Sequence, residues 1–166
     1  METIIKKNKK LLILVFIGCI SCVSDNQIFD EYQTLENAIW EADKPVEFYF
    51  SITDTISKNN LFINLRNNNK YPYSNLYIIT QLDFPDGNRI VDTLQYAMTD
   101  TKGNFLGAGF TEIKENKLFY KEQKVFPVPG EYHISIRQAM RKNGEITQIK
   151  KLEGVSDIGF RIEKTK

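Results

Sequence analysis

The chain has 166 residues, of which 42% are hydrophobic and 26% are charged, and its formal net charge is +1 at pH 7. This length can form one domain with a sizeable hydrophobic core. Because the charge is close to neutral, there is no electrostatic case for nucleic-acid binding, which would call for a basic face, and no nucleic-acid partner is expected.

The first residues have the pattern of a secretory signal. An apolar run spans residues 11–20 and is followed by Ser21 and Cys22; it is preceded by the basic residues Lys6, Lys7, Lys9 and Lys10. A transmembrane helix needs about 20 apolar residues, whereas a shorter run behind a charged head is typical of a cleaved signal. We therefore expect residues 1–21 to be a lipoprotein signal peptide.

A cysteine directly after the predicted cut resembles the site of lipid attachment in bacterial lipoproteins. Cys22 is the expected lipidation site because it gives the more usual apolar length and precedes a polar stretch; Cys19, which follows Gly18, is the alternative. About two or three acyl chains would make the attachment effectively permanent. Since cleavage before Cys22 removes the other cysteine, neither a disulfide nor a cysteine nucleophile is expected.

The remainder reads as an all-β protein. Segments with period-two alternation, or rich in β-branched and aromatic residues, occur at 46–52, 61–65, 76–84, 89–96, 119–125, 131–138, 146–149 and 155–162. About eight such strands at regular spacing predict an antiparallel β-sandwich over residues 45–166. Residues 22–44 are assigned to the lipid anchor, a short polar tether and an N-terminal extension. Only residues 37–42 look mildly helical, and Trp40 there is expected to plug the core at the sandwich edge.

Two turns between these strands have a clear mechanism. Pro85 presets φ and Gly87 accepts a positive φ, so residues 85–88 should join 76–84 and 89–96 in a hairpin. Residues 141–145 are expected to form the tip of a second hairpin.

Catalytic and metal-binding patterns are weak. His133 is the only histidine, and it stands within an alternating strand. No G-x-S-x-G, H-E-x-x-H, C-x-x-C or EF-hand pattern accompanies it. Asp83, Asp86 and Asp92 surround the 85–88 turn, where a calcium site is conceivable, but the turn itself accounts for Asp86. We expect neither an enzyme nor a metal or cofactor site; the alternative is a hydrolase based on His133.

Two polar loops contain the residue types that suit a recognition surface. The candidate partner-contact residues are Arg66, Asn67, Asn68, Asn69, Tyr71 and Tyr73 in the first loop, and Arg141 and Lys142 in the second. The plain alternative is that both loops only connect strands, because asparagine and glycine favour turns. Tyr71 and Tyr73 also suggest a different function, a module that binds glycan or peptidoglycan.

Several blocks of the chain resemble the gliding-motility lipoproteins called GldH. They are residues 21–22, 29–32, 61–73, 92–94, 107–118, 138–145 and 152–162. The resemblance implies a non-catalytic lipoprotein of the cell envelope that is needed for gliding, with the outer membrane as its expected location. It implies partners among other gliding-motility or secretion envelope proteins, because that machinery is linked to type IX secretion. Only the role of Cys22 transfers residue by residue, and no cofactor is implied.

Overall fold

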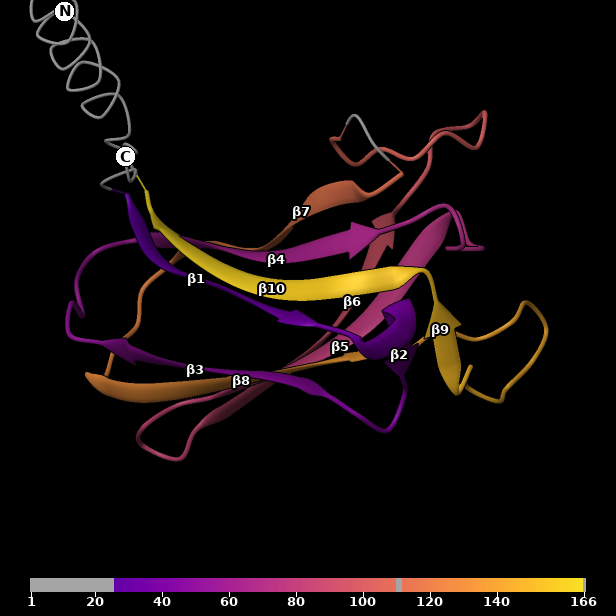
Figure 1. Cartoon of the computed structure of the whole chain (residues 1–166). Coiled ribbons are helices and arrows are strands. Elements are labelled where there is room, and N and C mark those ends of the chain that lie inside the picture. The colour runs from indigo at the N-terminus through magenta and orange to yellow at the C-terminus, as the bar shows by residue number, and fades with distance from the viewer. Residues whose placement is uncertain (1–25, 110–111, 166) are drawn as a thin grey trace, which may run out of the picture.

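A computed structural model describes residues 26–109 and 112–165, so the expected signal peptide, Cys19 and Cys22 lie outside the described residues. The described chain forms two layers of antiparallel strands (Figure 1). Sheet I has the order β1-β10-β4-β7 and contains β1 (Gln27–Thr34), β10 (Val155–Lys164), β4 (Asn59–Asn67) and β7 (Lys114–Lys124). Sheet II has the order β3-β8-β5-β6 and contains β3 (Val46–Ile52), β8 (Gly130–Gln138), β5 (Asn75–Asp83) and β6 (Arg89–Ala97).

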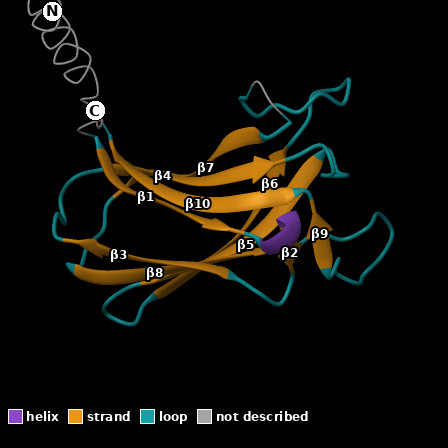
Figure 2. Cartoon of the chain, viewed as in Figure 1, coloured by secondary structure: helices purple, strands orange, loops and turns teal. Residues whose placement is uncertain are grey.

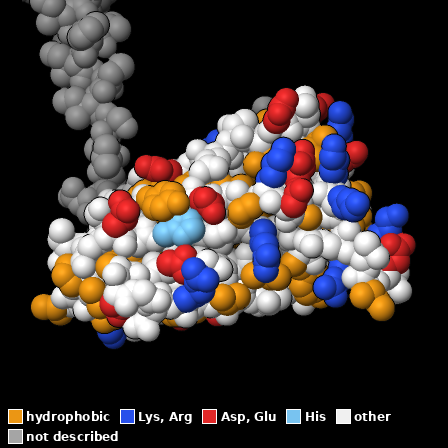
Figure 3. All heavy atoms as spheres, turned by 90° about the horizontal axis from the view of Figure 1, so that it is seen from below, with side chains coloured by type: hydrophobic (Ala, Val, Ile, Leu, Met, Phe, Trp, Pro, Cys, Tyr) orange, Lys and Arg blue, Asp and Glu red, His pale blue; other side chains and the backbone are white. Residues whose placement is uncertain are grey.

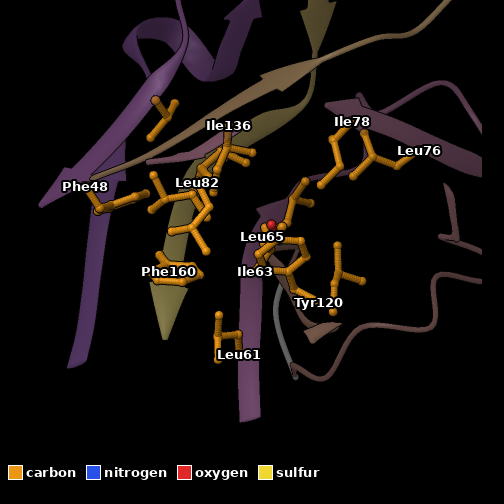
Figure 4. Packing of buried hydrophobic residues seen from close by; sticks show 14 of the residues in the cluster. Phe48, Leu61, Ile63, Leu65, Leu76, Ile78, Leu82, Tyr120, Ile136 and Phe160 are labelled. Carbon is orange, nitrogen blue, oxygen red and sulfur yellow. The ribbon is translucent and has the colours of Figure 1, made fainter. Parts of the chain in front are cut away.

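The predicted all-β antiparallel sandwich is confirmed, and the period-two pattern is its cause. In β3 the residues at 46, 48, 50 and 52 are buried, whereas those at 47, 49 and 51 are exposed. Alternate side chains of a strand point to opposite faces, so one face of each sheet lines the core. Figure 4 shows the two inner faces meeting, with Phe48 and Ile136 from sheet II opposite Phe160 and Ile63 from sheet I.

An aromatic cluster fills one part of this core. The ring of Phe50 lies 5.5 Å from that of Phe160, 5.7 Å from that of Phe126 and 5.6 Å from that of Tyr132. Phe29 of β1 joins the cluster, with ring centroids 5.6 Å from Phe50. Tilted and edge-on pairs at these distances contribute about 0.5–1.5 kcal/mol each beyond their burial. Strand β1, which pairs with β10 in sheet I, therefore also contacts sheet II through the side chain of Phe29.

The structure contains strands that the sequence pattern did not predict. Strands β1 and β2 (Ile39–Glu41) fall within residues 22–44, the segment assigned above to the anchor, tether and extension. Strand β2 pairs with β9 (Lys151–Glu153) in a separate two-stranded sheet at one end of the sandwich. The helix expected at 37–42 is not formed. A 3-10 turn spans Glu36–Ala38 (Figure 2), and strand β2 follows it directly at Ile39–Glu41. Trp40 is 1% exposed and occupies the predicted core position.

The segment after β8 also differs from expectation. Residues 146–149 are not a strand; instead a single bridge joins Arg141 to Gln148, and the backbone N–H of Glu145 donates to the carbonyl of Lys142. The polar and exposed character of residues 141–148 explains this, because a strand without a buried face gains little from pairing. The loop therefore extends away from the sandwich.

The strand register defines two opposite ends of the sandwich. Lys164 of β10 pairs with Asn59, and its N–H donates to the carbonyl of Asn26 at 2.8 Å, so the start of β1 lies at this end, called here the proximal end. At the other end of β10, Val155 pairs with Asn67, the last residue of β4, and the loop 68–74 follows Asn67. Strand β8 runs from the proximal end toward residues 139–150, so both loops lie at the distal end (Figure 1). Among the described residues there is no helix long and apolar enough to span a membrane.

Candidate partner-binding surface

The first polar loop is tightly packed rather than open. Asn67 is fully buried and its Oδ1 accepts a hydrogen bond from Asn116 Nδ2 at 2.8 Å. Asn68 forms a local turn in which its Oδ1 accepts from the backbone N–H of Lys70. Asn69 is exposed at the tip. Asn67 therefore serves the fold, and Asn69 is the asparagine that faces solvent.

The two tyrosines of this loop pack inward. Tyr71 is 4% exposed, and its hydroxyl donates to the carbonyl of Asn75 at 2.8 Å. Its ring lies edge-on to Tyr73, which is half-buried, with centroids 6.1 Å apart, and near Phe105 at 6.4 Å. Burial raises the pKa of Tyr71. A glycan platform needs open aromatic faces, and these contacts enclose that of Tyr71.

Arg66, the first residue of the same group, belongs to a paired network on the outer face of sheet I. Its Nε lies 2.9 Å from Glu115 Oε2, and its guanidinium stacks over Tyr32 at 4.3 Å from the ring centre. Tyr32 in turn donates to Glu115 Oε1 at 3.0 Å. Burial, followed by the charge of Glu115, raises the pKa of Tyr32 to about 12. The charge of Arg66 is thus already neutralised within the protein.

The second polar loop is open. Arg141 and Lys142 are exposed, as are the residues from 143 to 148, and they extend from the distal end beyond β8. Of the sequence-predicted contact residues, Asn69, Arg141 and Lys142 are the exposed ones. Arg141 also borders a surface hollow that sequence reasoning missed.

That hollow lies on the outer face of sheet II. It has a volume of about 370 Å³ and is lined by Tyr77, Ile79, Thr93, Ala139 and Arg141. A smaller hollow of about 150 Å³ shares Ile79 with it and is lined further by Ala42, Asp43, Pro45, Gln81, Val91, Ser135 and Arg137. We call the two together the distal groove. Figure 3 shows this face, on which basic side chains are found mainly toward the distal side.

A sequence signal for the groove does exist. Residues 76–79 read Leu-Tyr-Ile-Ile, so apolar side chains occupy both faces of β5 and not only the inner one. Leu76 and Ile78 are fully buried in the core, while Tyr77 and Ile79 are half-buried on the outer face. A strand that is apolar on both sides is typical of one covered on both faces.

His133 lies on the same outer face but nearer the proximal end. Its ring stacks on Tyr49 with centroids 4.6 Å apart, and its Nδ1 lies 3.1 Å from Asp83 Oδ2. Burial alone would raise the pKa of Asp83, but hydrogen bonds from Arg89, His133 and Gln81 lower it to about 2. Among the described residues no hydroxyl group is hydrogen-bonded to the imidazole, so the ring contacts carboxylates and not a nucleophile.

The three aspartates around the 85–88 turn do not converge. Asp86 accepts from the backbone and side chain of Asn88 within the turn, whereas Asp83 faces His133. Asp92 points toward β7, where its Oδ2 lies 3.0 Å from the hydroxyl of Tyr120 and 2.8 Å from Lys121 Nζ. No group of three or more potential metal ligands exists within the described ranges.

Comparison with known proteins identifies the family. The model of the GldH lipoprotein family matches residues 27–162. The chain belongs to the GldH lipoprotein family. The sequence-based prediction of a gliding motility lipoprotein is thereby confirmed, and family membership implies attachment to a membrane.

Two curated relatives match across nearly their whole length. The chain is 44% identical over 158 residues to the gliding motility lipoprotein GldH of Flavobacterium johnsoniae, covering 95% of this chain and 97% of that protein. It is 46% identical over 153 residues to the GldH homolog of Christiangramia forsetii, covering 92% and 91% respectively. Among solved structures, the infectious bursal disease virus VP2 subviral particle shares 12% identity at a TM-score of 0.37, covering 87% of this chain and 37% of that one. So low a score carries no argument about function.

Proposed function

We propose that this GldH-family protein is a non-catalytic docking component of the gliding machinery, anchored in the outer membrane through Cys22 and associated with the type IX secretion apparatus. Family membership supports the motility role. The single structural observation that supports docking is the polarity of the sandwich. Its N-terminal strand starts at the proximal end, whereas the exposed loop 141–148 and the distal groove lie toward the distal end.

The anchor geometry follows from chain length. Cys22 precedes Asn26, the first described residue, by a few peptide units, which span at most about 15 Å when extended. Strand β10 is 10 residues long, so the sandwich extends about 30 Å from the proximal end. A lipid on Cys22 would therefore hold the proximal end near the bilayer and leave the distal surface free for partners.

Tethering also makes weak contacts effective. Confinement of two partners to one membrane raises their effective concentration, so contacts of modest affinity are sufficient. A docking component of this kind requires neither a catalytic group nor a cofactor. The paired environment of His133, which contacts carboxylates, agrees with such a role.

A gene deletion tests the proposal. In a gliding host the deletion strain should fail to spread on agar and should display less surface adhesin, and a plasmid copy of the wild-type gene should restore both. Normal spreading together with normal adhesin display in the deletion strain would refute the proposed function. Crosslinking in intact cells, followed by identification of the captured envelope proteins, would then name the partners.

A further inference from the structure

The arginines of this protein fall into two groups. The chain has five, and three of them pair with carboxylates on the same molecule: Arg66 with Glu115, Arg89 with Asp83, and Arg161 with Asp30 and Glu163. Arg137 and Arg141 form no ion pair with any residue in the described ranges, and both line the distal groove. The fold thus leaves two guanidinium groups without a carboxylate, one lining each of the two adjoining hollows of the distal groove.

The strand register places these two groups around an apolar floor. Arg137 of β8 is directly opposite Ile79 of β5, and the N–H of Ala139 donates to the carbonyl of Tyr77. The chain then continues to Arg141, which borders the hollow that contains Tyr77 and Ile79. Val91, 58% exposed, extends the apolar floor across β6.

The charge of the groove remains positive when every ionisable lining residue is counted. Its lining contains two arginines and one carboxylate, that of Asp43, at the edge of the smaller hollow. The acidic side chain of Asp83 lies farther along the same face and is already paired with Arg89 and His133. The complement of the groove is therefore a ligand that carries negative charge and apolar groups together.

We propose that the distal groove binds an extended acidic segment of a partner protein. Carboxylates of the segment would pair with Arg137 and Arg141, because a guanidinium fork matches a carboxylate with two parallel hydrogen bonds. In an extended chain the side chains alternate between two faces, so the neighbouring apolar residues can lie on Tyr77, Ile79 and Val91. This inference deepens the proposed docking function and rests on it.

A polypeptide suits the groove better than an anionic lipid does. The groove lies toward the distal end, away from the start of β1 that leads to Cys22. A membrane that holds the lipid on Cys22 would therefore lie at the opposite end of the sandwich from the groove. An anionic glycan would pair with the arginines but would leave the floor of Tyr77, Ile79 and Val91 without apolar partners.

Binding of a defined peptide by the full lipidated protein tests the proposal. The protein is placed in phosphatidylcholine nanodiscs and titrated with a short labelled peptide that alternates glutamate and valine, and with the same peptide carrying glutamine. The glutamate peptide should bind, and the double variant R137Q/R141Q should bind it about tenfold more weakly. The matched double variant K102Q/K151Q removes the same charge at exposed lysines outside the groove and should bind like the wild type.

Three results would overturn the proposal. They are equal binding of the glutamate and glutamine peptides, binding by R137Q/R141Q within about twofold of wild type, and an equal loss in K102Q/K151Q. Phosphatidylglycerol vesicles and purified lipopolysaccharide are tested in parallel. Binding to either of these that depends on Arg137 and Arg141, without peptide binding, would assign the groove to an anionic membrane or glycan.

A cellular arm separates this inference from the proposed function. In the deletion strain, R137Q/R141Q should fail to restore spreading while K102Q/K151Q restores it, at equal protein levels in the membrane fraction. If the deletion strain spreads normally, the docking function itself fails. If deletion abolishes spreading but R137Q/R141Q restores it fully, only the assignment of the groove fails.

Discussion

Among the described glycines, Gly154 leaves the least room for a Cβ atom. It has φ of +83°, and a Cβ there would lie 2.2 Å from the backbone nitrogen of Tyr71. Its carbonyl accepts from the N–H of Asn68, and its own N–H donates to the carbonyl of Ala38. The glycine therefore holds the first polar loop against the β9–β10 junction, and no other residue fits this close approach.

Replacing Gly154 by alanine should destabilise the protein strongly. The positive φ alone costs about 1–2 kcal/mol for an L-residue, and the clash with Tyr71 must be relieved by moving the backbone. Gly144→Ala is the matched control, because Gly144 has φ of +79° but nothing within 4 Å of the added carbon. We expect Gly154→Ala to lose about 2 kcal/mol more than Gly144→Ala in denaturant unfolding. Equal losses would show that the contact with Tyr71 is unimportant.

Asp83 should give the stability of the protein a characteristic pH dependence. Its pKa in the folded state is about 2, below the ordinary aspartate value of 3.8, so the ionised form is favoured by folding. The resulting stabilisation is present above the unfolded pKa and is lost as the pH falls through about 4 to 2. Because the pair with Arg89 is partly exposed, the effect is about 1 kcal/mol at most.

Unfolding of Asp83→Asn and wild type over pH 2–7 measures this effect. The difference in unfolding free energy should be largest near neutral pH and should vanish toward about pH 2. Glu131→Gln, at an exposed position outside the described ion pairs, should differ from the wild type by the same small amount throughout. A constant difference for Asp83→Asn would mean that its carboxylate gains nothing from its neighbours.

Strand β1 joins the sandwich through backbone pairing with β10 and through the side chain of Phe29. The Phe29 ring lies 5.6 Å from Phe50 of sheet II and 6.1 Å from Phe160 of sheet I. Phe29→Ala should therefore lower the unfolding free energy by about 2–4 kcal/mol, measured by denaturant titration. Ile56→Ala serves as control, since Ile56 is 86% exposed, and should change stability by less than about 0.5 kcal/mol. Similar values for the two variants would place β1 outside the cooperative unit.

How well the sequence predicted each element depends on how that element is buried. Strand β3, which has one buried face, was predicted at its observed bounds because alternation marks it directly. Strand β1 has mostly exposed or half-buried residues, and its position depends on long-range pairing with β10, which includes Tyr32 opposite Gly159. A Cβ on residue 159 would meet the Tyr32 ring at 2.8 Å, and no local pattern encodes that fit.

The candidate site was likewise predictable only where it depends on local sequence and not on contacts between distant segments. Residue type alone suggested Tyr71 and Asn67 as contact residues, but both are enclosed by residues distant in the sequence. Phe105 and the backbone of Gly154 lie against Tyr71, and Asn116 of β7 donates to Asn67. Arg141 was named from its residue type in a polar loop at a predicted hairpin tip, whereas Arg137 was missed. Its importance comes from lying opposite Ile79 across two strands far apart in sequence. Pairing between distant segments is what the sequence left open.

At the scale of the whole molecule, attachment and folding should be separable. The described β-structure starts at Gln27, and Cys22 precedes it in the sequence, outside the described residues. Cys22→Ser should therefore leave the unfolding free energy of the sandwich unchanged while removing the lipid. The protein should then move from the membrane fraction to the soluble periplasm and fail to restore spreading in a deletion strain.

The alternative cysteine supplies the control for this last prediction. Cys19→Ser changes a residue inside the expected signal, so it should leave lipidation, membrane retention and spreading as in the wild type. Fractionation of cells grown with labelled palmitate measures both variants, with Cys22→Ser losing the label and Cys19→Ser keeping it. The opposite pattern would move the anchor to Cys19, and membrane retention of both variants without label would mean that the apolar run itself holds the protein in the bilayer. In that case residues 1–21 would remain attached, and the tether between membrane and sandwich would begin at the end of the apolar run rather than at Cys22.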